Sequence, residues 1–261
     1  MYNIIMKNPF ALTIFLNVLL VWHGSLKAEV ENYKADICVY GGTASGVMAA
    51  LAAEKEGSTV ILIEPTRCLG GMTGGGINHL DWGKGETVGG STYKILMEGL
   101  KDQKRAHGGH AKYGIGNKQY RERFKKLVKD RGITVIYDHR VGKVQVGDVT
   151  INKPTREQPI ALGEKIVSKN KNNFIQSIIL DYAPVDETGC PIPVPKKRNV
   201  IAVSAKVFID CSYEGDILGM SGVRYTWGRE SREHYDESLA GVRPSLWLHD
   251  IDPYVEPGNP K

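Results

Sequence analysis

The stretch ADICVYGGTASGVMAALAAEKEGSTVILIEP, residues 35–65, decides the fold of this 261-residue chain. It opens with an apolar run, Asp36 to Tyr40, that is typical of a short buried strand. After a glycine-rich turn, the alanine-rich segment Val47 to Glu56 favours a helix. Gly57 ends that helix, and Thr59 to Glu64 reads as a second strand rich in β-branched residues. Strand, glycine turn, helix and strand within about 30 residues predict a βαβ unit.

The turn of this unit, Gly41-Gly42-Thr43-Ala44-Ser45-Gly46, has the composition of a loop that binds a dinucleotide phosphate. Gly41 provides a tight exit from the strand, and Gly46 lets the helix lie close to it. Thr43 stands where the middle glycine of G-x-G-x-x-G is expected. Glu64 ends the second strand 18 residues after Gly46, where a carboxylate can accept hydrogen bonds from ribose hydroxyls. A packing turn without a nucleotide is the alternative interpretation.

The segment after the second strand favours FAD over NAD. Glu64-Pro65-Thr66-Arg67-Cys68-Leu69-Gly70-Gly71-Met72 resembles the corresponding segment of FAD-dependent oxidoreductases of the glutathione-reductase-like Rossmann type. In that group it passes beside the ribityl and pyrophosphate part of FAD. The resemblance implies that the cofactor contacts Glu64, Pro65, Gly70, Gly71 and Met72. An NAD-dependent dehydrogenase is the weaker alternative, because it rests on Glu64 alone.

Three further regions resemble the same family. They are the strand Gly132–Tyr137 with Arg140-Val141, the segment Val207–Asp216, and the pair Gly222–Ser231 and Tyr235–Gly241. Together they are similar to the FAD-dependent oxidoreductases grouped with heterodisulfide reductase A-like flavoproteins, in particular the exported bacterial branch linked with polysaccharide breakdown. The resemblance implies that Val141 contacts adenine through its backbone and that Asp210, Gly215 and Asp216 lie at the cofactor.

The expected fold is therefore α/β, a Rossmann-type FAD-binding domain with a β-rich insertion. The predicted boundaries are residues 35–146 for the first part of the domain, 147–198 for the insertion, 199–250 for the second part and 251–261 for a loop-like tail. Relatives close the flavin site with a strand near their C-terminus, and none is recognisable after Gly241. We therefore expect a fragment without this closure, and a non-catalytic remnant is an alternative to an active flavoenzyme.

Candidate catalytic residues lie in the glycine-rich stretch Gly74–Trp82. His79 or Asp81 would take a proton from a substrate hydroxyl while a hydride passes from a small or carbohydrate-like substrate to the flavin. A loop histidine bonded to backbone is an equally good interpretation of His79. Arg229 and Glu230 are candidate substrate residues, with an internal ion pair as the alternative. The sequence does not identify the electron acceptor.

The N-terminus, residues 1–28, reads as a signal peptide. Lys7 precedes the apolar stretch from Phe10 to Trp22, whose 13 residues suit a signal-peptide core and are few for a membrane span. Cleavage after Ala28 would export the protein to the periplasm or the medium and leave no stable membrane span. The alternative is an uncleaved anchor.

Charge and cysteine spacing exclude several other classes. The net charge of +5 falls to 32 − 29 = +3 without residues 1–28, which is too mild to predict nucleic-acid binding. The four cysteines are scattered without a C-x-x-C pair, so neither a metal site nor an iron–sulfur cluster is expected. A disulfide between Cys68 and Cys190 stays open at this point.

Overall fold

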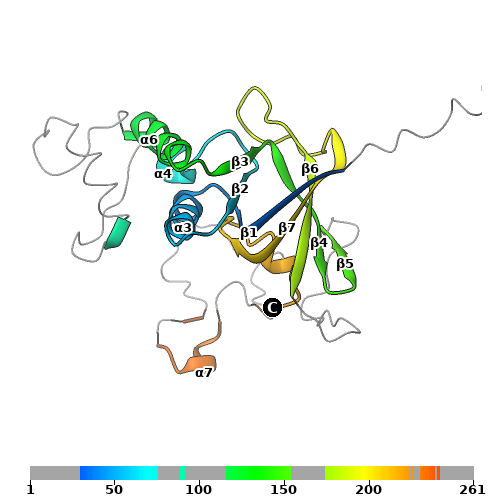
Figure 1. Cartoon of the computed structure of the whole chain (residues 1–261). Coiled ribbons are helices and arrows are strands. Elements are labelled where there is room, and N and C mark those ends of the chain that lie inside the picture. Colours follow the sequence, from blue (N-terminus) through cyan, green and yellow to red (C-terminus); the bar gives the residue numbers. More distant parts are fainter. Residues whose placement is uncertain are drawn as a thin grey trace, which may run out of the picture. The chain divides into compact units, whose positions relative to one another are not determined.

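The structure is a computed structural model that describes residues 30–75, 89–91, 116–153, 174–223, 225, 230–238 and 240–241. The chain divides into two compact units, Met1–Val223 and Arg224–Lys261. All strands of the described residues lie in the first unit (Figure 1). In the second unit, the short helix α7 (Arg232–Tyr235) begins after Ser231, and Gly241 N donates to Glu230 O at 3.0 Å.

Seven strands form one sheet with the order β3-β2-β1-β7-β6-β4-β5. Four of them pair in parallel: β1 (Glu31–Tyr40), β2 (Val60–Glu64), β3 (Thr134–Tyr137) and β7 (Lys197–Asp210). The other three join by antiparallel pairing: β4 (His139–Val146), β5 (Val149–Asn152) and β6 (Ile175–Tyr182). Parallel strands with helical connections confirm the predicted α/β, Rossmann-type fold.

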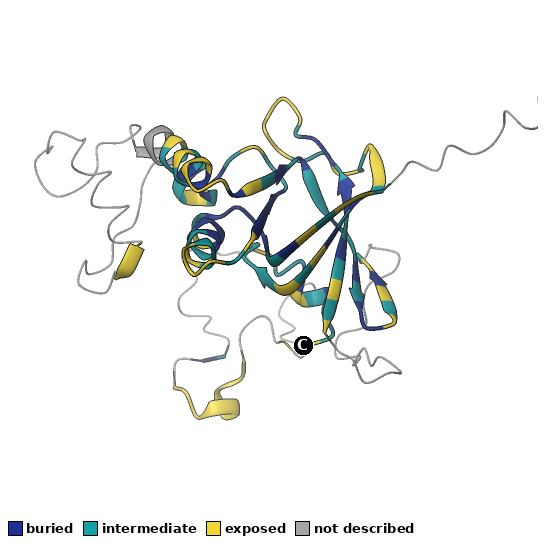
Figure 2. Cartoon of the chain, in the orientation of Figure 1, coloured by how far each residue is buried: buried dark blue, intermediate teal, exposed yellow. Residues whose placement is uncertain are grey.

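The predicted βαβ unit is present, with helix α3 (Ala44–Lys55) between β1 and β2. All five residues of β2 are buried, as expected for an inner parallel strand. Helix α6 (Gly116–Asp130) packs beside α3 and contributes Phe124 and Val128 to the same core as Val47 and Leu62. These two helices cover one face of the parallel strands, and Figure 2 shows that their buried residues face the sheet.

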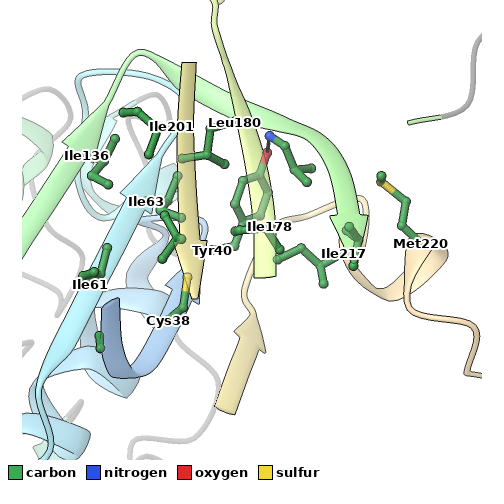
Figure 3. Packing of buried hydrophobic residues seen from close by; sticks show 14 of the residues in the cluster. Cys38, Tyr40, Ile61, Ile63, Ile136, Ile178, Leu180, Ile201, Ile217 and Met220 are labelled. Atoms are coloured by element: carbon green, nitrogen blue, oxygen red, sulfur yellow. Dashed lines mark hydrogen bonds between the residues drawn. The ribbon is translucent and has the colours of Figure 1, made fainter. Parts of the chain in front are cut away.

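The opposite face is covered by the antiparallel part of the same sheet, which folds back over it. Tyr40 at the end of β1 accepts a hydrogen bond from Val141 N of β4 at 3.1 Å, although β1 and β4 are not neighbours in the sheet. Their side chains share a second core with Ile178, Leu180 and other apolar residues of β6 and β7 (Figure 3). The sheet thus supplies both layers of this core.

The strands described between residues 147 and 198 extend the main sheet. β5 pairs with β4, which begins at His139, and β6 pairs with β7. The predicted signal peptide, residues 1–28, and the predicted tail, residues 251–261, lie outside the described residues. Within the described part of the chain, no helix is both long and apolar enough to span a membrane.

Candidate dinucleotide site

The turn between β1 and α3 depends on two glycines. Gly41 has a φ of +94°, and a Cβ there would lie 2.7 Å from Ser212 N. A Cβ on Gly46 would lie 1.9 Å from Gly41 O, so the first turn of α3 can approach the strand only with glycine. The predicted roles of the two glycines in the tight exit and the close helix packing are therefore confirmed by the backbone.

Thr43 replaces the expected glycine without strain, because its backbone is extended with a φ of −63°. Its hydroxyl caps α3 by accepting from Gly46 N at 3.2 Å. The same Oγ1 donates to Cys211 O at 2.9 Å and lies 2.9 Å from Ser45 Oγ. One hydroxyl thus caps the helix and ties the turn to the end of β7.

Glu64 points its carboxylate into this turn from the end of β2. Its Oε2 accepts from Gly42 N at 2.8 Å, and its Oε1 accepts from Thr66 N at 2.7 Å and Thr66 Oγ1 at 2.5 Å. The side chain is buried, and this burial raises the pKa of Glu64, while the hydrogen bonds from Thr66 and Gly42 oppose the rise. A carboxylate has about four acceptor positions, so the three donors found among the described residues leave one for a ribose hydroxyl.

The glycines after β2 form a second turn that crosses the first one. Gly70 N donates to Gly42 O at 2.7 Å, and Gly70 and Gly71 have φ values of +96° and +51°. A Cβ on Gly70 would lie 2.2 Å from Phe124 Cδ2. Helix α4 (Gly71–Gly75) begins here, and Arg121 Nε donates to Gly74 O at 3.0 Å. Gly70 is therefore required by packing against α6.

The loop after β7 is shaped by Asp210. Its Oδ1 accepts from Ser212 N at 3.0 Å and Ser212 Oγ at 2.7 Å. Its Oδ2 accepts from Ile217 N and Leu218 N, both at 2.8 Å. All four donors belong to the protein, so the carboxylate of this predicted cofactor residue organises the loop that ends at Leu218.

Asp216 and Val141, two other predicted cofactor residues, meet at Tyr40 on the sheet face opposite α3. Asp216 Oδ1 lies 2.8 Å from Lys153 Nζ, and its Oδ2 lies 3.4 Å from Tyr40 Oη. Tyr40 Oη also accepts from Val141 N. Burial, and then the charge of Asp216, raise the pKa of Tyr40. Gly215, with a φ of +66°, turns the loop just before Asp216.

The remaining predicted site residues fall into three groups. Pro65 and Met72 flank the glycines that follow β2, and Met72 is half-exposed. His79, Asp81 and Arg229 lie outside the described residues. Glu230 is exposed in the second unit. The structure therefore brings together the two glycine turns, Glu64 and the loop after β7.

Sequence reasoning missed two side chains of this site, Thr66 and Tyr213. A hydroxyl two residues after a strand-ending carboxylate is a turn signal that could have pointed to Thr66. Tyr213 Oη accepts from Met72 N at 2.8 Å across 141 residues of sequence, and no local pattern marks such a contact.

All four cysteines are free thiols, so Cys68 and Cys190 are not bonded to each other. Among the described residues, no group of three or more His, Cys, Asp or Glu side chains could hold a metal ion.

The arrangement fits a dinucleotide. The N-terminus of α3, a helix of 12 residues, faces a turn whose glycines allow close backbone approach, and a helix N-terminus favours a phosphate. The buried Glu64 carboxylate stands at the same turn, and its donors in the described part of the chain leave one acceptor position. A turn suited to phosphate and a carboxylate suited to a ribose hydroxyl thus lie next to each other.

Comparison with known proteins gives one family match. The family model described as FAD dependent oxidoreductase matches residues 36–161 and 165–257. No curated protein sequence matches the chain.

Among solved structures, a geranylgeranyl bacteriochlorophyll reductase-like protein from Thermoplasma acidophilum is 16% identical, with a TM-score of 0.41, over 74% of this chain and 43% of its own. A flavoprotein/dehydrogenase from Cytophaga hutchinsonii is 14% identical, with a TM-score of 0.41, over 75% and 44%. L-Proline dehydrogenase from P. horikoshii is 17% identical, with a TM-score of 0.33, over 70% and 23%. The chain spans less than half the length of each of these proteins.

Proposed function

The chain belongs to the FAD-dependent oxidoreductase family, and on that premise we propose that it binds FAD at the carboxyl ends of β1, β2 and β7 and oxidises a small, hydroxyl-bearing substrate. The contact that supports this proposal best is the hydrogen bond from Gly42 N to Glu64 Oε2 at 2.8 Å. It holds a carboxylate suited to ribose against a turn suited to phosphate.

In the proposed site, the turn from Gly41 to Gly46 holds the pyrophosphate and Glu64 accepts from a ribose hydroxyl. The crossing of Gly70 over Gly42 keeps the second glycine turn beside the first. FAD, when bound, supplies an acceptor for a hydride. The protein must supply a base for the proton of the substrate hydroxyl, and His79 and Asp81 are the candidates from the sequence.

The substrate class is proposed to be a small molecule or a sugar. The support is the resemblance of the sequence to the exported branch of the family that is linked with polysaccharide breakdown. Arg229 and Glu230 are proposed to contact this substrate, and a separate acceptor would reoxidise the flavin. Residues 1–28 support the further proposal that the protein is exported to the periplasm or the medium, which cell fractionation with an antibody to the chain would test.

The experiment that tests the proposed activity is anaerobic reduction of the FAD-loaded chain. The loaded protein is mixed with a panel of aldoses, polyols and small alcohols, and the visible flavin absorbance is followed. At least one hydroxyl compound is expected to bleach the flavin. The flavin absorbance should fall more slowly in His79→Gln or Asp81→Asn than in wild type. Absorbance that no compound of the panel lowers, although dithionite bleaches it, would contradict the proposed substrate class and leave FAD binding intact.

A further inference from the structure

Tyr213 connects two sides of the cofactor site. It stands in the loop after β7, and its Oη reaches the first turn of α4, where it accepts from Met72 N at 2.8 Å. The first N–H groups of a helix have no partner within the helix, so this hydroxyl satisfies a donor that otherwise needs water or a ligand. Tyr213 as a whole is 59% exposed. A large aromatic side chain is thus held in place mainly by its polar end.

The same hydroxyl lies directly against Gly71. A Cβ at Gly71 would lie 2.2 Å from Tyr213 Oη and 3.2 Å from Thr43 Cα. Three segments therefore meet at this point: the turn after β1, the turn after β2 and the loop after β7. Any residue other than glycine at 71 would push the phenol away, and the φ of +51° also favours glycine there.

The loop that carries Tyr213 is itself firmly held. Asp210 accepts four hydrogen bonds from it, and Ser212 Oγ accepts from Asp216 N at 2.9 Å. Thr43 Oγ1 binds Cys211 O two residues before Tyr213. The position of the Tyr213 hydroxyl is thus set by a loop with many hydrogen bonds, and its partner is the short glycine-rich helix α4.

We propose that Tyr213 is a cofactor-positioning residue whose hydroxyl holds the Met72 end of the second glycine turn against the loop after β7, while the Gly70–Gly42 hydrogen bond holds the start of that turn. This inference rests on the proposed FAD site. The spacing of the two turns decides how closely the pyrophosphate can approach both backbones, and misplacement of binding groups weakens binding. Tyr213 would therefore act on affinity for FAD through Met72 rather than on the stability of the sheet.

The decisive comparison uses the full chain and three proteins: wild type, Tyr213→Phe and Tyr33→Phe. Tyr213→Phe keeps the ring and removes only the acceptor for Met72 N. Tyr33→Phe is the matched control, because its phenol also makes one hydrogen bond, to Glu31 Oε1 at 2.6 Å near the start of β1. FAD titration, visible circular dichroism of bound flavin, amide exchange of Met72 and apo melting temperature are measured for each.

Tyr213→Phe is expected to raise the Kd for FAD roughly two- to tenfold, the effect of one neutral hydrogen bond. It should also speed Met72 exchange and alter the flavin circular dichroism, with an apo melting temperature close to that of wild type. Tyr33→Phe should change none of these.

FAD binding by Tyr213→Phe equal to wild type would overturn the inference, and tighter binding would do so too, since the phenol would then obstruct the site. Failure of wild type itself to bind FAD would instead refute the proposed function, and the inference would fall with it.

Discussion

Glu64 Oε2 accepts a hydrogen bond from Gly42 N at 2.8 Å, which joins the end of β2 to the turn that follows β1. A Cβ on Gly42 would lie 2.7 Å from the same oxygen, so the glycine leaves room for the carboxylate. The buried carboxylate and the backbone of the turn are thereby fixed as one unit. The proposed affinity for FAD depends on this unit.

The first prediction concerns pH. Burial raises the pKa of Glu64, so the folded state holds a proton that the unfolded state releases as pH rises above the unfolded pKa. This residue therefore favours folding most at acidic pH and loses that contribution as pH rises through the folded pKa. The affinity for FAD should instead fall at acidic pH, because a protonated carboxyl accepts hydrogen bonds less well than a carboxylate.

FAD affinity measured between about pH 7.5 and pH 5, above the reference glutamate pKa of about 4.3, should fall with acidification in wild type. The slope should be shallower in Glu64→Gln, which cannot ionise. Equal slopes in the two proteins would show that another group controls the pH dependence.

The second prediction concerns the hydroxyl of Thr43. Thr43→Val keeps the shape and removes both the cap on Gly46 N and the bond to Cys211 O. We expect a loss of about 1–2 kcal/mol in the free energy of unfolding, the usual effect of a lost N-cap. Thr43→Ser should retain most of the stability. Urea unfolding followed by far-UV circular dichroism measures both, and a valine variant as stable as wild type would refute the double role of the hydroxyl.

The third prediction concerns Gly70. Gly70→Ala would place a Cβ 2.2 Å from the ring of Phe124 at a φ of +96°. Overpacking and a strained backbone should together lower stability by about 2–4 kcal/mol. Gly75→Ala is the control, since among the described residues its Cβ would meet Cys68 Cβ alone, at 3.5 Å. Thermal melts of the two variants should differ clearly, and similar melts would mean that α6 shifts freely to make room.

The fourth prediction concerns the ion pair between Lys153 and Asp216. Its side chains are 37% and 21% exposed, so solvent screening limits its contribution to about 1 kcal/mol. Lys153→Met and Asp216→Asn should destabilise the chain to a similar degree in urea unfolding, and clearly unequal losses would contradict the ion pair as their shared cause. A much larger loss of FAD affinity in Asp216→Asn than in Lys153→Met would support the role at the cofactor that the family resemblance implies for Asp216.

The βαβ unit could be predicted from the sequence because its signals are local: an apolar run, glycines at the turn and an alanine-rich helix. The first four residues of β1 could not, since Glu31 to Lys34 are mostly polar. They are strand because they pair with Ile201 to Ser204 of β7, a partner far along the chain. Because this partner lies far along the chain, the polar residues at the start of β1 carry no local sign of the pairing.

The residues of the candidate site divide in the same way, into those marked by a local sequence signal and those that only the fold brings together. Glu64 and the glycines were predicted because dinucleotide binding requires them at a fixed spacing. The contact of Tyr213 with Met72 spans 141 residues and depends on the loop that Asp210 shapes. Asp210 was predicted as a cofactor residue from the family resemblance, whereas the four protein donors to its carboxylate became visible only in the folded chain.

The fifth prediction tests the central claim, that this chain holds FAD through the Glu64–Gly42 unit. The measurement is retention of flavin after gel filtration of the chain with excess FAD, for wild type, Glu64→Gln and the exposed control Glu56→Gln. Wild type and Glu56→Gln should elute with equimolar FAD. Glu64→Gln should lose FAD on the column, because its affinity for FAD is expected to be roughly 10- to 100-fold lower, the effect of hydrogen bonds to a charged group. A wild-type chain that elutes without flavin, or a Glu64→Gln variant that holds FAD as tightly as wild type, would contradict the claim.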